Sequence, residues 1–349
     1  MTARVKMQRV YKLIDLFAGV RGVRIGFQNA FKKEGEFVFS SEIDEKAKET
    51  YALNHKEIPI GDITKVHVSK IPKHDIVLAA FPCQAFSVAG KRMGFEDTRG
   101  TLFFEVARII KHHEPEVVFL ENVKNLHTHD KGNTFRVIKE TLNKLGYKVF
   151  YNVLNAKDYD LPQNRERIFI VGFKNHDAEF KFPSPKKAIK TIHSCILDST
   201  RVDEKYYYDD KPLYEKIKDD VKCQDTIYQW RRKYVRANKS GVCPTLTANM
   251  GTGGHNVPII KDDKGIRKLT PRECANFQGF PKAFKTPQGM ADSHLYKQFG
   301  NSVPIALVEE IAKEIKITLD IFKNRDFWHF SSDDKGVEPA SEEKTKRNF

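Results

Sequence analysis

The chain has 349 residues, of which 40% are hydrophobic, including 25 Phe and 12 Tyr. Its length predicts about two domains, and its composition excludes a disordered chain, a collagen and a disulfide-stapled miniprotein. The 60 Lys and Arg against 46 Asp and Glu give a net charge of +14, which favours a polyanionic partner such as nucleic acid. No apolar run approaches the ~18 residues that cross a bilayer, and residues 1–10 lack a secretory signal. We therefore expect a soluble intracellular protein.

From Tyr11 to about Phe173, short apolar runs alternate with amphipathic stretches of helical length. The expected strands are Tyr11–Phe17, Phe37–Ser40, Ile76–Ala80, Val117–Glu121, Lys148–Val153 and Arg167–Phe173. The expected helices between them include Glu45–Asn54, Leu102–His113 and Thr134–Leu145. This alternation predicts an α/β fold with a doubly wound, mostly parallel sheet. Ligands on such folds bind beyond the carboxyl ends of the strands.

The pattern changes after Phe173, where a polar, basic stretch rich in Tyr and Gly runs to about Pro287. We interpret it as a smaller, irregular second domain. Residues 222–272 contain eleven Lys and Arg and three Asp, so more than half of the positive excess lies in this stretch. Apolar periodicity returns over Val303–Phe322 and predicts a helix, and the tail from about Ser331 is polar.

Polar groups follow three successive stretches of the first half of the chain. The turn after the first strand reads Asp15-Leu-Phe-Ala-Gly-Val-Arg-Gly22, and its glycines would let a ligand approach the backbone closely. Glu42 ends the second strand, where a carboxylate could accept hydrogen bonds from ribose hydroxyls. Gly61-Asp-Ile63 adds another carboxylate. Together these groups predict a pocket for a nucleoside.

The five cysteines are widely spaced and form no CxxC or Cys/His cluster, so neither a disulfide framework nor a metal site is expected. Cys83, in Phe81-Pro-Cys-Gln, follows a buried strand, and this position favours a reactive thiolate. Glu121 ends the next strand at the same edge of the sheet. Arg165 and Arg167, two apart, would point to one face and hold an anionic or carbonyl oxygen.

With these residues the chain closely resembles cytosine-5 DNA methyltransferases, especially the compact bacterial enzymes of restriction–modification systems. The resemblance extends from about Tyr11 to Lys323. Seven motifs appear in the expected order: Asp15-Leu-Phe-Ala-Gly, Gly61-Asp-Ile, Phe-Pro-Cys83-Gln, Glu121-Asn-Val, Gln163-x-Arg-x-Arg167, Arg267-x-Leu-Thr-Pro-Arg-Glu273 and Gly300-Asn-Ser-Val303.

The resemblance implies a Rossmann-like fold that uses S-adenosylmethionine. A catalytic, cofactor-binding domain would comprise residues 1–183, completed by 292–326. A target-recognition domain and hinge would comprise 184–291, followed by a polar tail at 327–349. The Cys83 thiolate would attack C6 of a flipped-out cytosine, and Glu121 would bind or protonate N3. Arg165, with Arg167 in support, would hold O2.

The resemblance also implies the residues that bind each partner. The S-adenosylmethionine site would comprise Phe17, Ala18, Gly19, Val20, Gly22, Glu42, Ile43, Asp62, Ile63, Pro82, Leu102, Asn301, Ser302 and Val303. The contacts to double-stranded DNA would comprise Gln84, Ser87, Lys91, Gln163, Arg231, Arg232, Arg236, Thr245, Asn249 and His255. Residues 87–100 would close behind the flipped base. The other cysteines, Cys195, Cys223, Cys243 and Cys274, would be structural.

Two positions depart from the family pattern. Arg21 replaces a glycine of many relatives, and we expect it to exclude some conformations of positive φ and to add charge near the loop. Ile43 stands where some relatives stack an aromatic ring on adenine, which predicts weaker cofactor binding. We expect a cytoplasmic, nucleoid-associated monomer, and the resemblance allows a cognate restriction endonuclease that forms no stable complex with it.

Three other functions stay open at this point. One branch of the family modifies tRNA, although the Thr245-Leu-Thr core is that of the bacterial DNA enzymes. A non-catalytic DNA-binding protein would lack the nucleophile or the acid, and both Cys83 and Glu121 are present. A nicotinamide-dependent dehydrogenase is disfavoured because the glycine pattern is not G-x-G-x-x-G.

Overall fold

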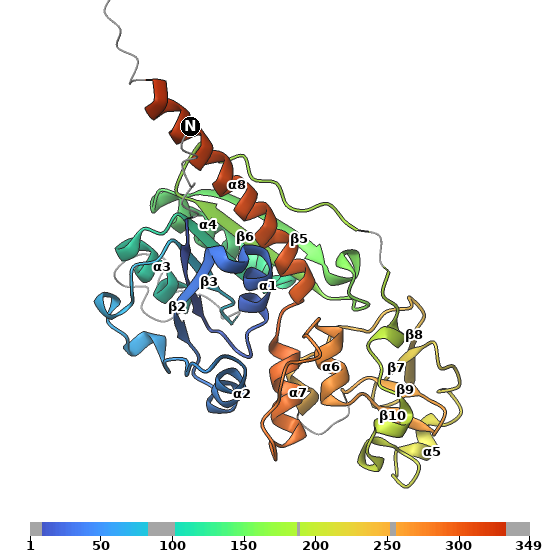
Figure 1. The fold of residues 1–349 in the computed structure, drawn as a ribbon. Coiled ribbons are helices and arrows are strands. Elements are labelled where there is room, and N and C mark those ends of the chain that lie inside the picture. The colour runs from blue at the N-terminus through green and yellow to red at the C-terminus, as the bar shows by residue number, and fades with distance from the viewer. Residues whose placement is uncertain (1–8, 83–101, 187–188, 252–255, 333–349) are drawn as a thin grey trace, which may run out of the picture.

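The computed structural model describes residues 9–82, 102–186, 189–251 and 256–332. In these residues it contains two sheets, a larger one with helices on both faces and a smaller one beside it (Figure 1). Helices α6 (Pro271–Phe277) and α7 (Asp292–Asn301) lie between the two sheets in this view.

The larger sheet has six strands in the order β2-β1-β3-β4-β6-β5. These are β1 (Tyr11–Leu16), β2 (Gly35–Ser41), β3 (Ile76–Ala79), β4 (Val117–Val123), β5 (Lys148–Asn155) and β6 (Glu166–Phe173). The first four pair in parallel, and β6 is antiparallel to both β4 and β5. The predicted α/β fold with a mostly parallel sheet is confirmed, with one reversed strand.

Helices cover both faces because successive side chains of each central strand point to opposite sides. Leu13 and Leu78 belong to the core under α1 (Gly22–Phe31) and α8 (Ile305–Ser332). Ile14 and Val77, their sequence neighbours, belong to the core on the other face. That second core contains the apolar sides of α3 (Leu102–His113) and α4 (Asn133–Lys144). This double cover explains why the strands read as continuous apolar runs.

The turn between β1 and α1 has an unusual backbone. Phe17, Gly19 and Arg21 have φ values of 57°, 52° and 79°. Arg21 therefore adopts a positive φ in the left-handed region, and the expectation that it excludes some other conformations of positive φ stays a prediction. Its guanidinium carbon lies 4.5 Å from the ring centroid of Tyr51, in α2 (Glu45–His55), and the side chain is buried. Stacking on an aromatic face offsets part of the cost of this strained conformation.

The smaller sheet is wholly antiparallel, with the order β10-β9-β7-β8. Its strands are β7 (Ile227–Trp230), β8 (Val235–Asn238), β9 (Ile259–Lys261) and β10 (Ile266–Lys268), and α5 (Tyr214–Ile217) precedes them. A compact core forms beneath it from Tyr208, Ile217, Val221, Tyr228, Ile259 and Ile266. The sheet lies within the segment expected to recognise the target, and the limits given for the domains stay a prediction.

A third core joins α6 and α7 to the β1–α1 segment and to strands β7 and β9 of the smaller sheet. It combines Val20 and Ile25 of the large-sheet region with Leu246 and Phe299. Neither helix was predicted from the sequence, although α6 carries a recognisable start signal. Thr270 accepts a hydrogen bond from the backbone N–H of Glu273, whose carboxylate accepts one from the N–H of Thr270.

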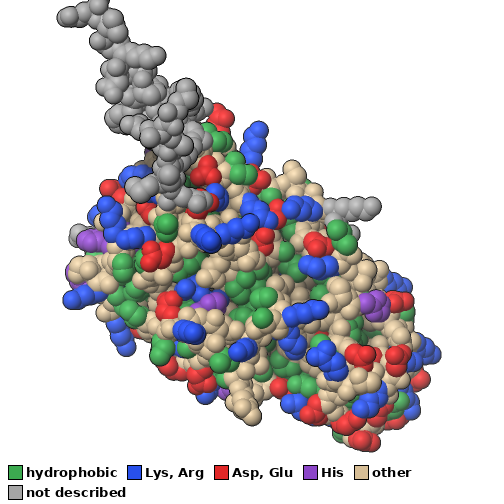
Figure 2. Space-filling view, viewed as in Figure 1, with side chains coloured by type: hydrophobic (Ala, Val, Ile, Leu, Met, Phe, Trp, Pro, Cys, Tyr) green, Lys and Arg blue, Asp and Glu red, His purple; other side chains and the backbone are tan. Residues whose placement is uncertain are grey.

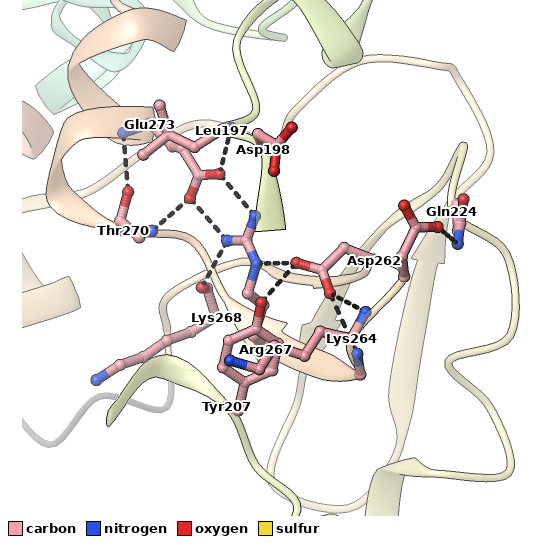
Figure 3. Close-up of polar contacts among 12 residues, drawn as sticks. Leu197, Asp198, Tyr207, Gln224, Asp262, Lys264, Arg267, Lys268, Thr270 and Glu273 are labelled. Carbon is pink, nitrogen blue, oxygen red and sulfur yellow. Dashed lines mark hydrogen bonds and ion pairs between the residues drawn. The ribbon is translucent and has the colours of Figure 1, made fainter. Parts of the chain in front are cut away.

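Arg267 forms the centre of a buried ion-pair network that ties β10 to α6 (Figure 3). Its Nη2 lies 2.8 Å from Oε1 of Glu273, and both side chains are fully buried. Its Nε binds Asp262, which also accepts a hydrogen bond from the hydroxyl of Tyr207. Arg267 therefore cannot contact DNA, although it counts toward the basic stretch 222–272.

Two more cations of the basic stretch are bound by other groups of the protein. Lys264 is paired with Glu204, and Arg272 donates to backbone carbonyls of Phe280, Pro281 and Phe284. On the face drawn in Figure 2, blue Lys and Arg side chains are interspersed with red Asp and Glu over both parts of the molecule. Positive charge on this face is therefore not gathered into one patch.

Candidate active site

A cavity of about 540 Å³ opens at the carboxyl ends of the parallel strands. We call it the main cavity. All fourteen residues expected to bind the cofactor line it: Phe17, Ala18, Gly19, Val20, Gly22, Glu42, Ile43, Asp62, Ile63, Pro82, Leu102, Asn301, Ser302 and Val303. Glu121, Arg165 and Arg167 line the same cavity. The fold thus brings together groups that lie up to 286 positions apart in the chain.

Glu42 organises the wall formed by the β1–α1 turn. Its Oε2 accepts the backbone N–H of Gly19 at 2.7 Å, and its Oε1 accepts that of Asp44 at 2.8 Å. Each carboxylate oxygen keeps a second lone pair. Glu42 can therefore hold the turn and still accept a hydrogen bond from a ligand.

Asp62 presents an ionised carboxylate at another wall. It caps a short 3-10 turn, and its Oδ1 accepts hydrogen bonds from the hydroxyl and the N–H of Thr64 at 2.7 and 3.0 Å. The hydroxyl contact, followed by the N–H, lowers the pKa of Asp62. Ile43, which also lines the main cavity, is 67% exposed. It therefore offers an apolar side chain to a ligand in the cavity.

The floor of the main cavity contains a buried hydroxyl that needs a partner. Ser302 Oγ is buried and makes no hydrogen bond to any described residue. Gly22 packs directly against it, since a Cβ at Gly22 would lie 2.6 Å from Ser302 Oγ and 2.7 Å from Val303 Cγ2. Carboxylates at the walls, apolar side chains and a free buried hydroxyl fit a nucleoside that carries a charged tail.

Glu121 and Arg167 form an ion pair at the far end of the main cavity. Nε of Arg167 lies 3.1 Å from Oε1 of Glu121. In the register of β4 and β6, Glu121 faces Phe169, so Arg167 lies on the diagonal and shares its face. Burial raises the pKa of Glu121, although Arg167 and Arg165 oppose the shift. The carboxyl group therefore takes up a proton more readily than an exposed glutamate.

Arg165 has different partners from Arg167. It is 1% exposed, and its Nη1 donates to the carbonyl of Leu246 at 2.6 Å. Its Nη2 donates to the carbonyls of Gly300 and Ser302. Both terminal nitrogens are thus engaged by backbone oxygens. This arrangement differs from the expected one, in which Arg165 binds the substrate oxygen and Arg167 supports it.

The strand that leads toward Cys83 is anchored beside Glu121. Nδ2 of Asn122, the residue after Glu121, donates to the carbonyl of Phe81 at 2.8 Å.

Five residues of the expected site lie outside the described residues: Cys83, Gln84, Ser87, Lys91 and His255. The expected lid, residues 87–100, lies outside them as well.

A second, strongly polar depression of about 350 Å³ lies beside the smaller sheet. We call it the polar cleft. Its lining residues are Asn164, Gln229, Arg231, Arg236, Asn238, Pro244, Thr245, Thr247, Asn249 and Asn256. Four of these, namely Arg231, Arg236, Thr245 and Asn249, were expected at the DNA. Arg232 is exposed in the β7–β8 turn but does not line the cleft.

Gln163 requires a correction, because it was expected to contact DNA and is fully buried. Its Oε1 accepts the N–H of Leu246 at 3.2 Å, and its Nε2 donates to the carbonyl of Phe277 at 2.9 Å. Among the other cysteines, Cys195, Cys243 and Cys274 are buried as expected of structural residues, but Cys223 is exposed.

Sequence reasoning missed several cavity and cleft residues. Nζ of Lys297, in α7, donates to Oδ2 of Asp44 at 2.6 Å, and both line the main cavity. Asp44 carries a helix-cap signal, since its side chain accepts the N–H of Ala47 at the start of α2. Gln229, opposite Arg236 across β7 and β8, shares the polar cleft. Lys297 and Gln229 carry no local motif.

The comparisons with known proteins agree with this geometry. The model of the C-5 cytosine-specific DNA methylase family matches residues 11–317, so the chain belongs to that family. It is a DNA cytosine-5 methyltransferase, and the methyl donor of such enzymes is S-adenosylmethionine.

Relatives match over most of their length. The chain is 52% identical over 311 residues to the type II methyltransferase M.Bsp6I of Bacillus sp. (strain RFL6), covering 87% of this chain and 98% of that protein. It is 43% identical over 328 residues to the type II methyltransferase M.NlaX of Neisseria lactamica, covering 90% and 99%. The solved Entamoeba histolytica methyltransferase EhMeth has the same fold, with a TM-score of 0.69 at 18% identity, covering 89% and 99%.

Among the helices that the structure describes, none combines the length and the apolar character that a membrane-spanning helix needs.

Proposed function

We propose that the protein is the modification enzyme of a type II restriction–modification system and methylates a cytosine within a short, specific duplex site. M.Bsp6I and M.NlaX are type II methyltransferases, and the match to M.Bsp6I spans nearly that whole protein. A cognate endonuclease would act on the same site without a stable complex. The chain would work as a monomer in the cytoplasm, on the DNA of the nucleoid.

The main cavity would hold S-adenosylmethionine, which supplies an electrophilic methyl group when bound. Glu42 would accept hydrogen bonds from the ribose hydroxyls through its remaining lone pairs, and Asp62 would accept one from the adenine amine. The buried Ser302 hydroxyl, which no described residue satisfies, supports a ligand with polar groups at this wall. Ile43 would cover adenine with less area than an aromatic ring.

The buried pair of Glu121 and Arg167 is the observation that carries the chemistry. Glu121, with its raised pKa, would hydrogen-bond to or protonate N3 of cytosine as the Cys83 thiolate adds to C6. That addition places enamine electron density at C5. Arg167 would hold O2, because it is ion-paired with Glu121, whereas both terminal nitrogens of Arg165 bind backbone carbonyls of the cavity and cleft walls.

The remaining steps restore the cytosine ring. C5 would form a carbon–carbon bond to the methyl group as the sulfur–methyl bond of S-adenosylmethionine breaks, so C5 would carry both the methyl group and its original proton. A base then removes that proton, and the electron pair expels the Cys83 thiolate from C6. The products would be 5-methylcytosine, S-adenosylhomocysteine and the free thiolate. The ring atoms are inaccessible in a stacked duplex, so the base must first be flipped out.

The polar cleft would lie against DNA. Arg231 and Arg236 offer planar donors that suit guanine edges or phosphates, and Gln229 and Asn249 offer amides that suit base edges. Arg231 Nη2 donates to Oε1 of Gln229 at 3.0 Å, which orients both groups. Thr245 would lie near a phosphate of the target strand.

Bisulfite sequencing of plasmid DNA treated with the purified protein and S-adenosylmethionine tests the proposal. We expect protected cytosines in one short motif only, and no protection from Cys83→Ser protein. Labelled-methyl transfer to tRNA but not to duplex DNA would contradict the proposal and favour an RNA substrate. No transfer to either, from folded protein that binds the cofactor, would favour a silent DNA-binding protein.

A further inference from the structure

One buried guanidinium joins the walls of the main cavity and the polar cleft. Arg165 donates to the carbonyl of Leu246, which lies between Thr245 and Thr247 of the cleft. The same guanidinium donates to the carbonyls of Gly300 and Ser302, both of which line the main cavity. Its planar fork can bind separate carbonyls at fixed angles, which a single ammonium cannot do.

Gln163 makes a second link between the same walls. Its side chain accepts the N–H of Leu246 and donates to the carbonyl of Phe277 and to Oε1 of Gln278. Gln278 in turn donates to the carbonyl of Phe299, next to Gly300 in α7. Leu246 is therefore held at both its N–H and its carbonyl.

The two walls also touch directly. A Cβ at Gly300 would lie 2.3 Å from the carbonyl carbon and oxygen of Thr247 and 2.6 Å from the N–H nitrogen of Ala248. Backbone at such close approach cannot shift on one side without displacing the other. Contacts and hydrogen bonds thus make segment 245–248 and segment 300–302 one mechanical unit.

We propose that Arg165 is a positioning residue that couples DNA binding at the polar cleft to cofactor binding in the main cavity. The inference rests on the proposed function, which puts DNA at the cleft. A duplex that orders segment 245–248 would also order the cavity wall at 300–302 through the Arg165 guanidinium. Because binding free energies are reciprocal, the cofactor would strengthen DNA binding by the same factor.

The test measures the dissociation constant of S-adenosylhomocysteine by calorimetry, with and without a duplex. The duplex carries the sequence motif that the protein methylates in the bisulfite experiment. In the wild type we expect the duplex to tighten binding by roughly 5–150-fold. Arg165→Lys should lower this ratio several-fold, while the Gln163 link and the contact of Gly300 with Thr247 remain. Binding without DNA is measured in the same variant, so that a change in the ratio is separated from a change in the cavity wall itself. Arg167→Lys is the matched control, since it alters the same motif and leaves the Leu246 bridge intact. It should keep the ratio and lose turnover.

An unchanged ratio in Arg165→Lys would overturn the proposal, and so would an equal loss of the ratio in both variants. If thermal melting shows that Arg165→Lys does not fold, Gln163→Met decides the question. This variant keeps Arg165 and removes the second link, so the ratio should fall in it too; an unchanged ratio there overturns the coupling. If the wild-type protein methylates DNA but binds S-adenosylhomocysteine equally tightly with and without the duplex, the coupling alone is refuted. A wild-type protein without DNA methylation refutes the proposed function itself.

Discussion

Nε of Arg167 lies 3.1 Å from Oε1 of Glu121, across the antiparallel pair β4 and β6 at the end of the main cavity. Only 7% of Glu121 is exposed. Burial raises the pKa of this carboxyl, and the two arginines of the same cavity oppose the shift, so the group takes up a proton more readily than an exposed glutamate does. General acids work best when their pKa approaches the working pH.

Removing that proton donor should slow turnover without removing the ligand. We expect Glu121→Gln to lower the methylation rate by roughly 10²–10⁴-fold and to leave S-adenosylhomocysteine binding unchanged. Single-turnover methyl transfer and calorimetry measure the two quantities. Glu140→Gln, an exposed carboxylate paired with Arg136 on α4, is the control and should behave as wild type. Unchanged transfer in Glu121→Gln would remove N3 activation from the mechanism.

Asp15 should make the stability depend on pH. Burial raises its pKa to about 7 from an ordinary value of 3.8, against the opposing charges of Arg24 and Arg21, and with Glu42 and Glu57 adding to the rise. The folded state therefore holds a proton that the unfolded state has released. This contribution to stability is complete below about pH 4 and is lost as pH rises through about 7.

Urea unfolding at pH 5 and pH 8 checks this sign. The wild type should lose stability between these values by more than Asp15→Asn does, because asparagine does not titrate. Asp177→Asn, at an exposed position, should show the wild-type difference. An Asp15→Asn variant with the wild-type slope would show that another group controls the dependence.

Gly22 should be required for the cofactor as well as for packing. Gly22→Ala and Gly26→Ala each place a Cβ 2.6 Å from a neighbouring side-chain atom, of Ser302 and Val308 respectively. We expect both variants to lose roughly 1–3 kcal/mol of unfolding free energy, because cores resist overpacking. Only Gly22→Ala should weaken S-adenosylhomocysteine binding, because Gly22 and Ser302 line the main cavity and Gly26 and Val308 do not. Equal affinities of the two variants would contradict the placement of the ligand.

The Arg267 network should contribute strongly to stability. Arg267→Met leaves the Glu273 carboxylate buried without its cation, which costs about 3–5 kcal/mol in comparable pairs. Adding Glu273→Gln to Arg267→Met should recover part of the loss by removing the unpaired charge. Urea unfolding measures all three proteins, with the exposed Arg201→Met as the control. An Arg267→Met protein as stable as wild type would show that the network only fixes geometry.

DNA binding should weaken with salt. Each neutralised phosphate contributes a slope of about −0.9 to the dependence of log affinity on log salt concentration. Arg232→Gln, at the exposed β7–β8 turn, should make the slope shallower by about that amount, and Arg136→Gln on α4 should leave it unchanged. Fluorescence anisotropy at several salt concentrations measures the slopes. A flat dependence in the wild type would show that the basic stretch does not touch the DNA backbone.

Much of the fold could be predicted because its signals are local. The six strands of the larger sheet are apolar runs, and α3 begins and ends where the periodicity predicts, at Leu102 and His113. The reversed direction of β6 could not be predicted, because an apolar run reads alike in both directions. Helix α7 was not predicted either. Its buried residues Leu295, Tyr296 and Phe299 pack in a core that distant segments of the chain complete.

The sequence alone determined which chemical groups are present and in what order. Cys83, Glu121, Glu42 and Asp62 occur in motifs whose residue types indicate the family and its reaction. Only the tertiary structure decided how the two arginines of one motif divide their contacts. Residues 165 and 167 are equivalent in charge and spacing, but one guanidinium meets the carbonyls of Leu246 and Gly300, and the other meets a carboxylate. Hydrogen bonds to backbone atoms 81 and 135 positions away leave no trace in local sequence, because every residue carries the same carbonyl.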